Sequence, residues 1–140
     1  MQPGCLIHLD NDYLAKLSEF GGEYRDVQNW ILNEHPIGTS AIAWNEFMRG
    51  PNNNGRNKAD EAAAKDLLKA GIAPFGEEAA ALGAYLFNMI QRPSGSHVKL
   101  RMDCLIAASA ITDKAVLATR NLSHFRRFVP YQLDLTDIEL

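Results

Sequence analysis

Residues 103–119 read DCLIAASAITDKAVLAT, and this stretch carries the clearest information about the fold. From Asp103 to Asp113 the side chains are apolar nearly all round a helix, which predicts a buried helix. Residues 115–119 form a short, uninterrupted apolar run, which predicts a buried strand. A buried helix followed closely by a buried strand is typical of a sheet that helices cover on both faces.

The same alternation of short apolar runs and helical patterns continues outward from this stretch. The apolar runs predict strands at residues 5–9, 37–43, 72–75, 115–119 and 131–135. The helical patterns predict helices at residues 13–20, 23–34, 44–49, 59–70, 77–91 and 103–113. Pro74 places the third strand at a sheet edge or at a strand end, and residues 93–96 are predicted to form a turn. We therefore expect a three-layer α/β/α fold with a central, mainly parallel sheet.

Length and composition indicate one globular domain. The chain has 140 residues, of which 46% are hydrophobic and 22% charged. Its apolar runs are shorter than the roughly 18–20 residues of a membrane span, and residues 1–4 begin no secretory signal, so we expect a cytoplasmic protein. Cys5 and Cys104 lie in apolar stretches that are typical of free thiols. Without a CxxC motif or paired histidines they predict no zinc site.

Positive charge gathers in one segment of an acidic chain. The net charge is −3, which does not indicate a non-specific nucleic-acid binder. Residues 91–127, however, contain seven Lys and Arg residues against Asp103 and Asp113, a net charge of +5. This segment fits a phosphate-bearing substrate at one face, although an unevenly charged, solvated surface explains it equally well.

Four polar side chains stand at the ends of predicted core elements. Asp10 and Glu46 each follow one of the first two predicted strands. Asp103 opens the buried helix, and Asn121 follows the strand after that helix. Because ligands bind at the carboxyl ends of the strands in parallel sheets, we expect these side chains to converge at one edge.

Converging carboxylates predict a site for a hard divalent cation. Carboxylates that face one another repel and are costly to bury unless a cation neutralises them. Oxygen ligands without cysteine or paired histidines select Mg²⁺ or Mn²⁺, which activates water for phosphodiester hydrolysis. Each residue also has a structural interpretation. Asp10, Asp12 and Asp103 are suitable helix caps, Glu46 an ordinary surface charge and Asn121 a turn residue.

Four segments, in order and at matching spacing, resemble motifs of PIN domains. Residues 9–14, LDNDYL, resemble the LDTNVL-like opening of that family, and residues 39–47, TSAIAWNEF, resemble the segment that carries its glutamate. Residues 103–110, DCLIAASA, are similar to the DxxIAAxA helix. Residues 117–125, LATRNLSHF, are similar to the TxNxxHF segment of VapC-like members. The resemblance covers essentially the whole chain and implies a single PIN-like domain over residues 1–140.

The resemblance implies a metal-dependent endoribonuclease that uses Mg²⁺ or Mn²⁺. Its metal-binding and catalytic acids would be Asp10, Glu46 and Asp103, with Asp10 and Asp103 as direct ligands. Glu46 would bind metal or orient the attacking water. The residues implied to support these acids by hydrogen bonds are Asn121, Thr119, Ser40 and Asp12.

The resemblance also implies partners. VapC-like members are toxins of toxin–antitoxin pairs, so it implies an RNA substrate, a cognate antitoxin whose tail enters the active-site groove, and a homodimer. The basic residues near the acids would contact RNA phosphates, and these are Arg101, Arg120, Arg126 and Arg127. Phe125 and Tyr13 offer aromatic surfaces for stacking on bases, although core packing is the more common role of such a phenylalanine.

Two positions depart from the family pattern. Asp12 stands where many members have asparagine, so it either joins the metal site or caps the first helix, and we favour the cap. His124 stands where some members carry a fourth acid, so the number of metal ions, one or two, is open. A role for His124 as general acid is conceivable, but packing or RNA contact is the favoured interpretation.

Two other functions are open from the sequence. The DxD pattern of Asp10 and Asp12 after an apolar strand also matches haloacid-dehalogenase-like phosphatases, which form an aspartyl-phosphate. Those enzymes need a hydroxyl soon after the second aspartate and a late acidic pair, whereas Tyr13 and a lone Asp103 stand here. The second alternative is a non-catalytic PIN-like module that binds RNA or protein, although all three acids of the site are present.

Overall fold

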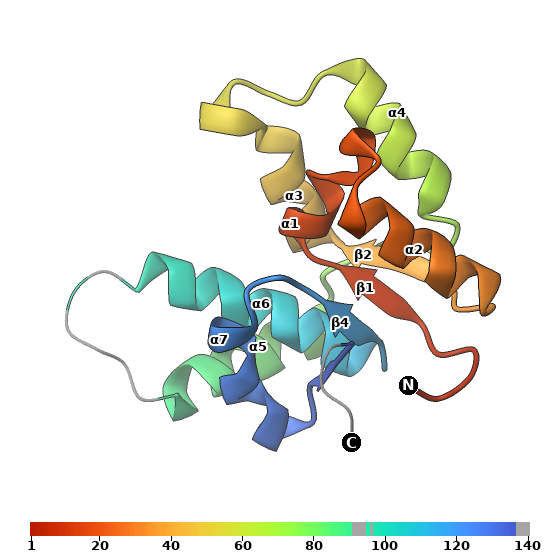
Figure 1. Ribbon diagram of the computed structural model, residues 1–140. Coiled ribbons are helices and arrows are strands. Elements are labelled where there is room, and N and C mark those ends of the chain that lie inside the picture. Colours follow the sequence, from red (N-terminus) through yellow and green to blue (C-terminus); the bar gives the residue numbers. More distant parts are fainter. Residues whose placement is uncertain (91–94, 96, 137–140) are drawn as a thin grey trace.

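A fully parallel sheet forms the centre of the computed structural model, which describes residues 1–90, 95 and 97–136 (Figure 1). Its strands are β1 (Ile7–Leu9), β2 (Ile37–Ser40), β3 (Gly71–Ala73), β4 (Val116–Ala118) and β5 (Asp134–Leu135). The strand order is β3-β2-β1-β4-β5, and every neighbouring pair is parallel. The predicted edge strand is confirmed, because β3 lies at an edge and ends at Ala73, before Pro74.

The chain order reverses beside the central strand. After β1 the chain builds β2 and β3 on one side, and then returns to place β4 and β5 on the other. Leu9 of β1 pairs with Ala118 of β4, so the two strands end next to each other. In parallel sheets such a reversal opens a crevice outside the carboxyl ends of the strands, where ligands bind.

Helices cover both faces of the sheet (Figure 1). The α-helices are α1 (Asn11–Leu14), α2 (Gly22–Leu32), α3 (Ala41–Arg49), α4 (Lys58–Leu67), α5 (Glu77–Met89), α6 (Val98–Thr112) and α7 (Leu122–Phe125). Short 3₁₀ segments lie at Leu17–Glu19, Pro51–Asn53 and Arg126–Tyr131. No helix in the described ranges is long and apolar enough to span a membrane.

Two hydrophobic cores, one on each face, hold the layers together. Ile7 and Leu9 of β1 pack with Phe47 of α3 and other buried side chains of α1, α2 and α4. Leu117 of β4 packs in the opposite core with Leu86 of α5 and residues of α6 and α7. Neighbouring strand residues thus face opposite cores, as the pleat requires. The predicted three-layer α/β/α fold is confirmed.

Two helix starts differ from the prediction. α6 begins at Val98, so Asp103 does not open this helix but lies in its second turn. Its first turn includes exposed Lys99 and Arg101, and the apolar pattern marks only the buried part that follows. The strand predicted over residues 37–43 ends at Ser40, because the Ser40 hydroxyl accepts a hydrogen bond from the Ala43 amide and begins α3.

Two other elements are shorter than predicted. Residues 13–20 do not form one helix, since α1 ends at Leu14 and a 3₁₀ segment follows. The last strand has only Asp134–Leu135, because a 3₁₀ segment continues to Tyr131. The predicted turn at residues 93–96 falls outside the described residues, apart from Gly95.

The close approach of β2 and β3 makes a specific stability prediction. Gly38 pairs with Gly71, and a Cβ on Gly38 would lie 2.9 Å from the Gly71 carbonyl oxygen. Since a backbone atom cannot move aside cheaply, we expect Gly38→Ala to lower the free energy of unfolding by about 1–3 kcal/mol in urea titrations. Gly83→Ala is the control. Its Cβ meets the movable Leu105 side chain, and a gain in helix propensity of about 1 kcal/mol offsets the strain. Equal losses in the two variants would contradict the prediction.

Candidate active site

Asp10 stands at the carboxyl end of β1 and is buried, with 7% of its surface exposed. It is the N-cap of α1, and its Oδ1 accepts a hydrogen bond from the Asn11 amide at 2.8 Å. Its Oδ2 accepts a second hydrogen bond, at 2.9 Å, from the hydroxyl of Thr119 at the end of β4. Both oxygens are therefore fixed at the point where the strand order reverses.

Thr119 links the two neighbouring strand ends. Its hydroxyl is fully buried and lies 3.3 Å from Oδ2 of Asp12, in addition to its contact with Asp10. The same oxygen accepts a hydrogen bond from the Asn121 amide at 3.0 Å. The structure thus places Thr119 beside Asp10 and joins the Asn121 backbone to the same hydroxyl. The strand ends predicted Asn121 near Asp10, whereas Thr119 was implied only by the family resemblance.

Asp12 does not cap the first helix, so that interpretation is wrong. Asp10 occupies the N-cap, and Asp12 lies within α1. The carboxylate of Asp12 points instead toward the β4–α7 loop, where its Oδ2 accepts a hydrogen bond from the Arg120 amide at 2.8 Å.

Glu46 and Ser40 belong to the β2–α3 segment. Glu46 is half-buried on α3, the helix that Ser40 caps. The hydroxyl of Ser40 accepts from the Ala43 amide at 3.0 Å, so its described contact supports the helix that carries Glu46.

Asp103 is buried on α6, with 2% of its side chain exposed, and basic groups surround it. Its Oδ2 accepts a hydrogen bond from Nη2 of Arg127 at 3.2 Å and lies 3.4 Å from Nδ1 of His124. The same His124 nitrogen lies 2.9 Å from the side-chain amide of Asn121. His124 and Asn121 therefore connect the α7 segment to Asp103.

Burial and mutual repulsion disfavour the charged forms of the acids. Burial, followed by the charges of Asp12 and Glu46, raises the pKa of Asp10 to about 7. Burial also raises the pKa of Glu46, and the charges of Asp103 and Asp12 add to this effect. Burial raises the pKa values of Asp12 and Asp103 as well. Glu46 thus lies within electrostatic reach of Asp10, Asp12 and Asp103.

Lys99 is a neighbour of this region that the sequence did not single out. Its charge lowers the pKa of both Glu46 and Asp103. Lys99 precedes Asp103 by four residues on α6, which places the two on the same helix face. That spacing was readable from the sequence only with the true start of α6, which the apolar pattern did not reveal.

The acids fit a hard divalent cation by their chemistry. All are oxygen donors, and the repulsion between them is the kind that Mg²⁺ or Mn²⁺ relieves. Among the residues that the structure describes, no three Asp, Glu, His or Cys side chains lie close enough to hold one ion. Asp103 is turned to Arg127 and His124, so a shared ion requires side-chain rotation there.

The predicted RNA-binding arginines have different surroundings. Arg120 stacks on Tyr13 and forms ion pairs with Glu23 and Asp26 at 3.0 and 3.2 Å, and Arg127 is paired with Asp103. Arg126 is exposed. The stacking role considered for Tyr13 and Phe125 is wrong, because both rings are buried in the cores.

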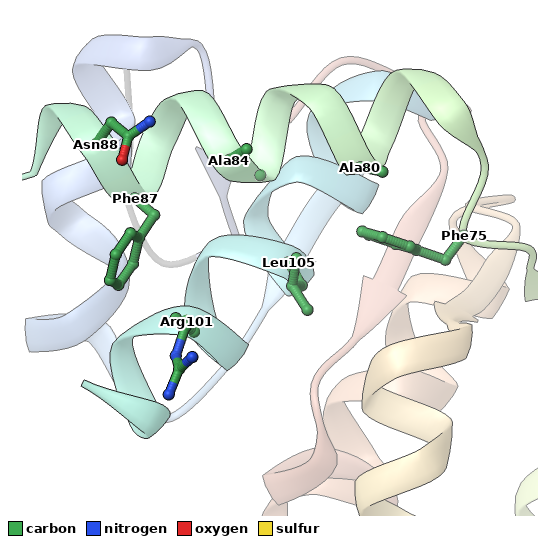
Figure 2. A pocket seen from close by; sticks show the side chains of 8 residues that line it. Phe75, Ala80, Ala84, Phe87, Asn88, Arg101 and Leu105 are labelled. Atoms are coloured by element: carbon green, nitrogen blue, oxygen red, sulfur yellow. The ribbon is translucent and has the colours of Figure 1, made fainter. Parts of the chain in front are cut away.

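Arg101 borders an apolar pocket of about 360 Å³ between α5 and α6 (Figure 2). The pocket is lined by Phe75, Ala80, Gly83, Ala84, Phe87, Asn88, Arg101 and Leu105. Figure 2 shows the Phe87 ring and the Arg101 side chain at one end of the group of lining residues, with Phe75 at the other end. Arg101 and Leu105 lie on α6, so the pocket adjoins the helix that carries Asp103.

The chain belongs to the PIN-domain family, whose model matches residues 9–129. Among solved structures, a chain of VapBC2 from Rickettsia felis, bound to a promoter DNA fragment, has a TM-score of 0.70 at 18% identity, covering 96% of this chain and 99% of that one. A chain of VapBC-1 from nontypeable Haemophilus influenzae has a TM-score of 0.67 at 20% identity, covering 94% and 97%. A toxin–antitoxin complex from Klebsiella pneumoniae gives 0.63 at 20% identity, covering 97% and 99%. No curated protein matches the chain.

The raised pKa of Asp10 predicts how stability depends on pH. Between its ordinary value of 3.8 and about 7, the folded state holds a proton that the unfolded chain has released. The stability of the metal-free protein therefore decreases as pH rises through this window. Asp10→Asn keeps the cap but removes the charge. We expect it to melt several degrees above wild type at pH 8 in EDTA, and to lose most of this advantage near pH 4. A variant that is no more stable than wild type at pH 8 would contradict this electrostatic picture.

Proposed function

We propose that the chain is a divalent-metal-dependent endoribonuclease that acts as the toxin of a toxin–antitoxin pair. The observation that supports this most strongly is the grouping of Asp10, Glu46 and Asp103 at the carboxyl end of the sheet, beside the reversal of strand order. The charge of Glu46 raises the pKa of Asp10, that of Asp103 raises the pKa of Glu46, and burial makes each acid costly without a counter-ion.

In this proposal Asp10 and Asp103 hold Mg²⁺ or Mn²⁺ directly, and Glu46 binds the ion or orients the attacking water. The cation supplies an activated water and neutralises charge on the phosphodiester. Thr119 keeps Asp10 oriented through its hydroxyl, and Asn121 and Ser40 support the loop and helix around the acids.

RNA would be held by basic groups near the acids. Lys99, Arg101 and Arg126 are exposed, and the described part of the chain gives none of them an ion pair, so they are free to contact phosphates. Arg120 and Arg127 are already paired with carboxylates. An RNA contact of either arginine would therefore compete with an internal ion pair.

The similar solved complexes support the assignment as a toxin. Their descriptions name VapBC complexes and a toxin–antitoxin complex, so we propose a cognate antitoxin as the protein partner of this chain. A homodimer, a single-domain organisation over residues 1–140 and a cytoplasmic location complete the proposal. A haloacid-dehalogenase-like phosphatase is not supported, because the matching family is the PIN domain.

Cleavage of total cellular RNA by the purified protein tests the proposal. We expect discrete fragments with Mg²⁺ or Mn²⁺ and none with EDTA. Asp10→Asn and Asp103→Asn should each reduce cleavage by about 100-fold or more, because each removes a charge that the cation needs. Asp66→Asn, on the exposed surface of α4, is the control for the loss of one charge and should cleave like wild type. Intact RNA with both ions would contradict the enzyme and favour a binding module.

A further inference from the structure

Asp12 is an acid beside Asp10 whose role the fold does not explain. It lies within α1, and it forms no ion pair in the described part of the chain. Its Oδ2 is fixed by the Arg120 amide at 2.8 Å. Its Oδ1 is buried and has no hydrogen-bond partner among the described residues. A carboxylate that is held at one oxygen and unpaired at the other is expensive unless something compensates it.

The donors around Asp10 and Asp12 are too few for two charged carboxylates. The Thr119 hydroxyl lies within 3.3 Å of an oxygen from each, but it has a single proton and can donate to only one. Of its two contacts, the shorter is to Asp10. The second carboxylate then has the Arg120 amide on one oxygen, and the described residues give its other oxygen no hydrogen-bond partner.

The Arg120 side chain supplies only part of the missing charge. Its guanidinium is held by Glu23 and Asp26, which share its positive charge. Burial raises the pKa of Asp12, although the Arg120 and Tyr13 amides, the Thr119 hydroxyl and the Arg120 charge each lower it. The neighbourhood of Asp12 therefore remains short of positive charge.

We propose that Asp12 presents its Oδ1 as a fourth carboxylate to the divalent cation of the site, an inference that rests on the proposed function. The Thr119 hydroxyl lies 2.9 Å from Oδ2 of Asp10 and 3.3 Å from Oδ2 of Asp12, so the two carboxylates lie side by side. The charge of Asp12 also raises the pKa of Asp10 and of Glu46, in agreement with this placement. A buried, unpaired carboxylate oxygen is the kind of ligand that Mg²⁺ and Mn²⁺ prefer. Arg120 then has the role of a positioning residue, because its amide aims the carboxylate and its side chain anchors the loop to α2.

Calorimetric titration of the full chain with Mn²⁺ tests this role without relying on activity. Asp12→Asn keeps the shape and an oxygen but removes the charge. We expect it to weaken Mn²⁺ binding by about tenfold or more, as loss of a charged ligand does. Asp66→Asn removes a charge at an exposed site on α4 and should bind Mn²⁺ like wild type. Asp10→Asn serves as the reference for loss of a direct ligand.

A second measurement separates a metal ligand from a structural residue. In EDTA, Asp12→Asn should melt at or above the temperature of wild type, because it removes repulsion with Asp10 and Glu46. Weaker Mn²⁺ binding together with a lower melting temperature in EDTA would assign Asp12 a structural role and overturn the inference. If Asp12→Asn fails to fold, Asp12→Ser, which keeps a small acceptor for the Arg120 amide, is held to the same two criteria.

The outcomes distinguish this inference from the proposed function. Wild-type affinity in Asp12→Asn, with binding lost in Asp10→Asn, would overturn the role of Asp12 and leave the metal site intact. No Mn²⁺ binding by wild type would overturn the proposed function, and the inference about Asp12 with it.

Discussion

The burial of like-charged carboxylates beside the β1–β4 junction is the constraint on which the rest of the site depends. The parallel sheet brings Asp10 and Thr119 together because β1 and β4 end side by side. The Thr119 hydroxyl can satisfy one carboxylate, while Asp12 and Glu46 add charge to the same region. Basic groups offset part of this charge: Arg127, His124 and Lys99 lower the pKa of Asp103, and Arg120 lowers that of Asp12.

Stability and function are therefore opposed at this edge of the sheet. The two hydrophobic cores fix the strands from both faces and tolerate a group of charges that destabilises the metal-free fold. A protein that only had to fold would place neutral side chains at these strand ends. The acids at this edge thus support the proposed divalent cation.

Local sequence patterns predicted the strands, the layers and the positions of Asp10 and Asn121, because these follow from strand ends in a parallel sheet. They failed where a partner is distant in the chain. The Asp12 carboxylate contacts the Arg120 amide, which is more than a hundred positions away in the chain. No local sequence pattern could therefore show that Asp12 does not cap the first helix. The pairing of Arg127 with Asp103 was hidden for the same reason. The true start of α6 was hidden because the apolar pattern marks only the buried part of the helix.

Anomalous diffraction from crystals soaked in Mn²⁺ tests the central claim most directly, because it locates the ion without reference to activity. We expect an anomalous peak bounded by oxygens of Asp10, Glu46 and Asp103, with the Asp103 carboxylate turned away from Arg127. A peak elsewhere, or no peak while Asp103 keeps its contact with Arg127, would contradict the claim that these acids share a cation.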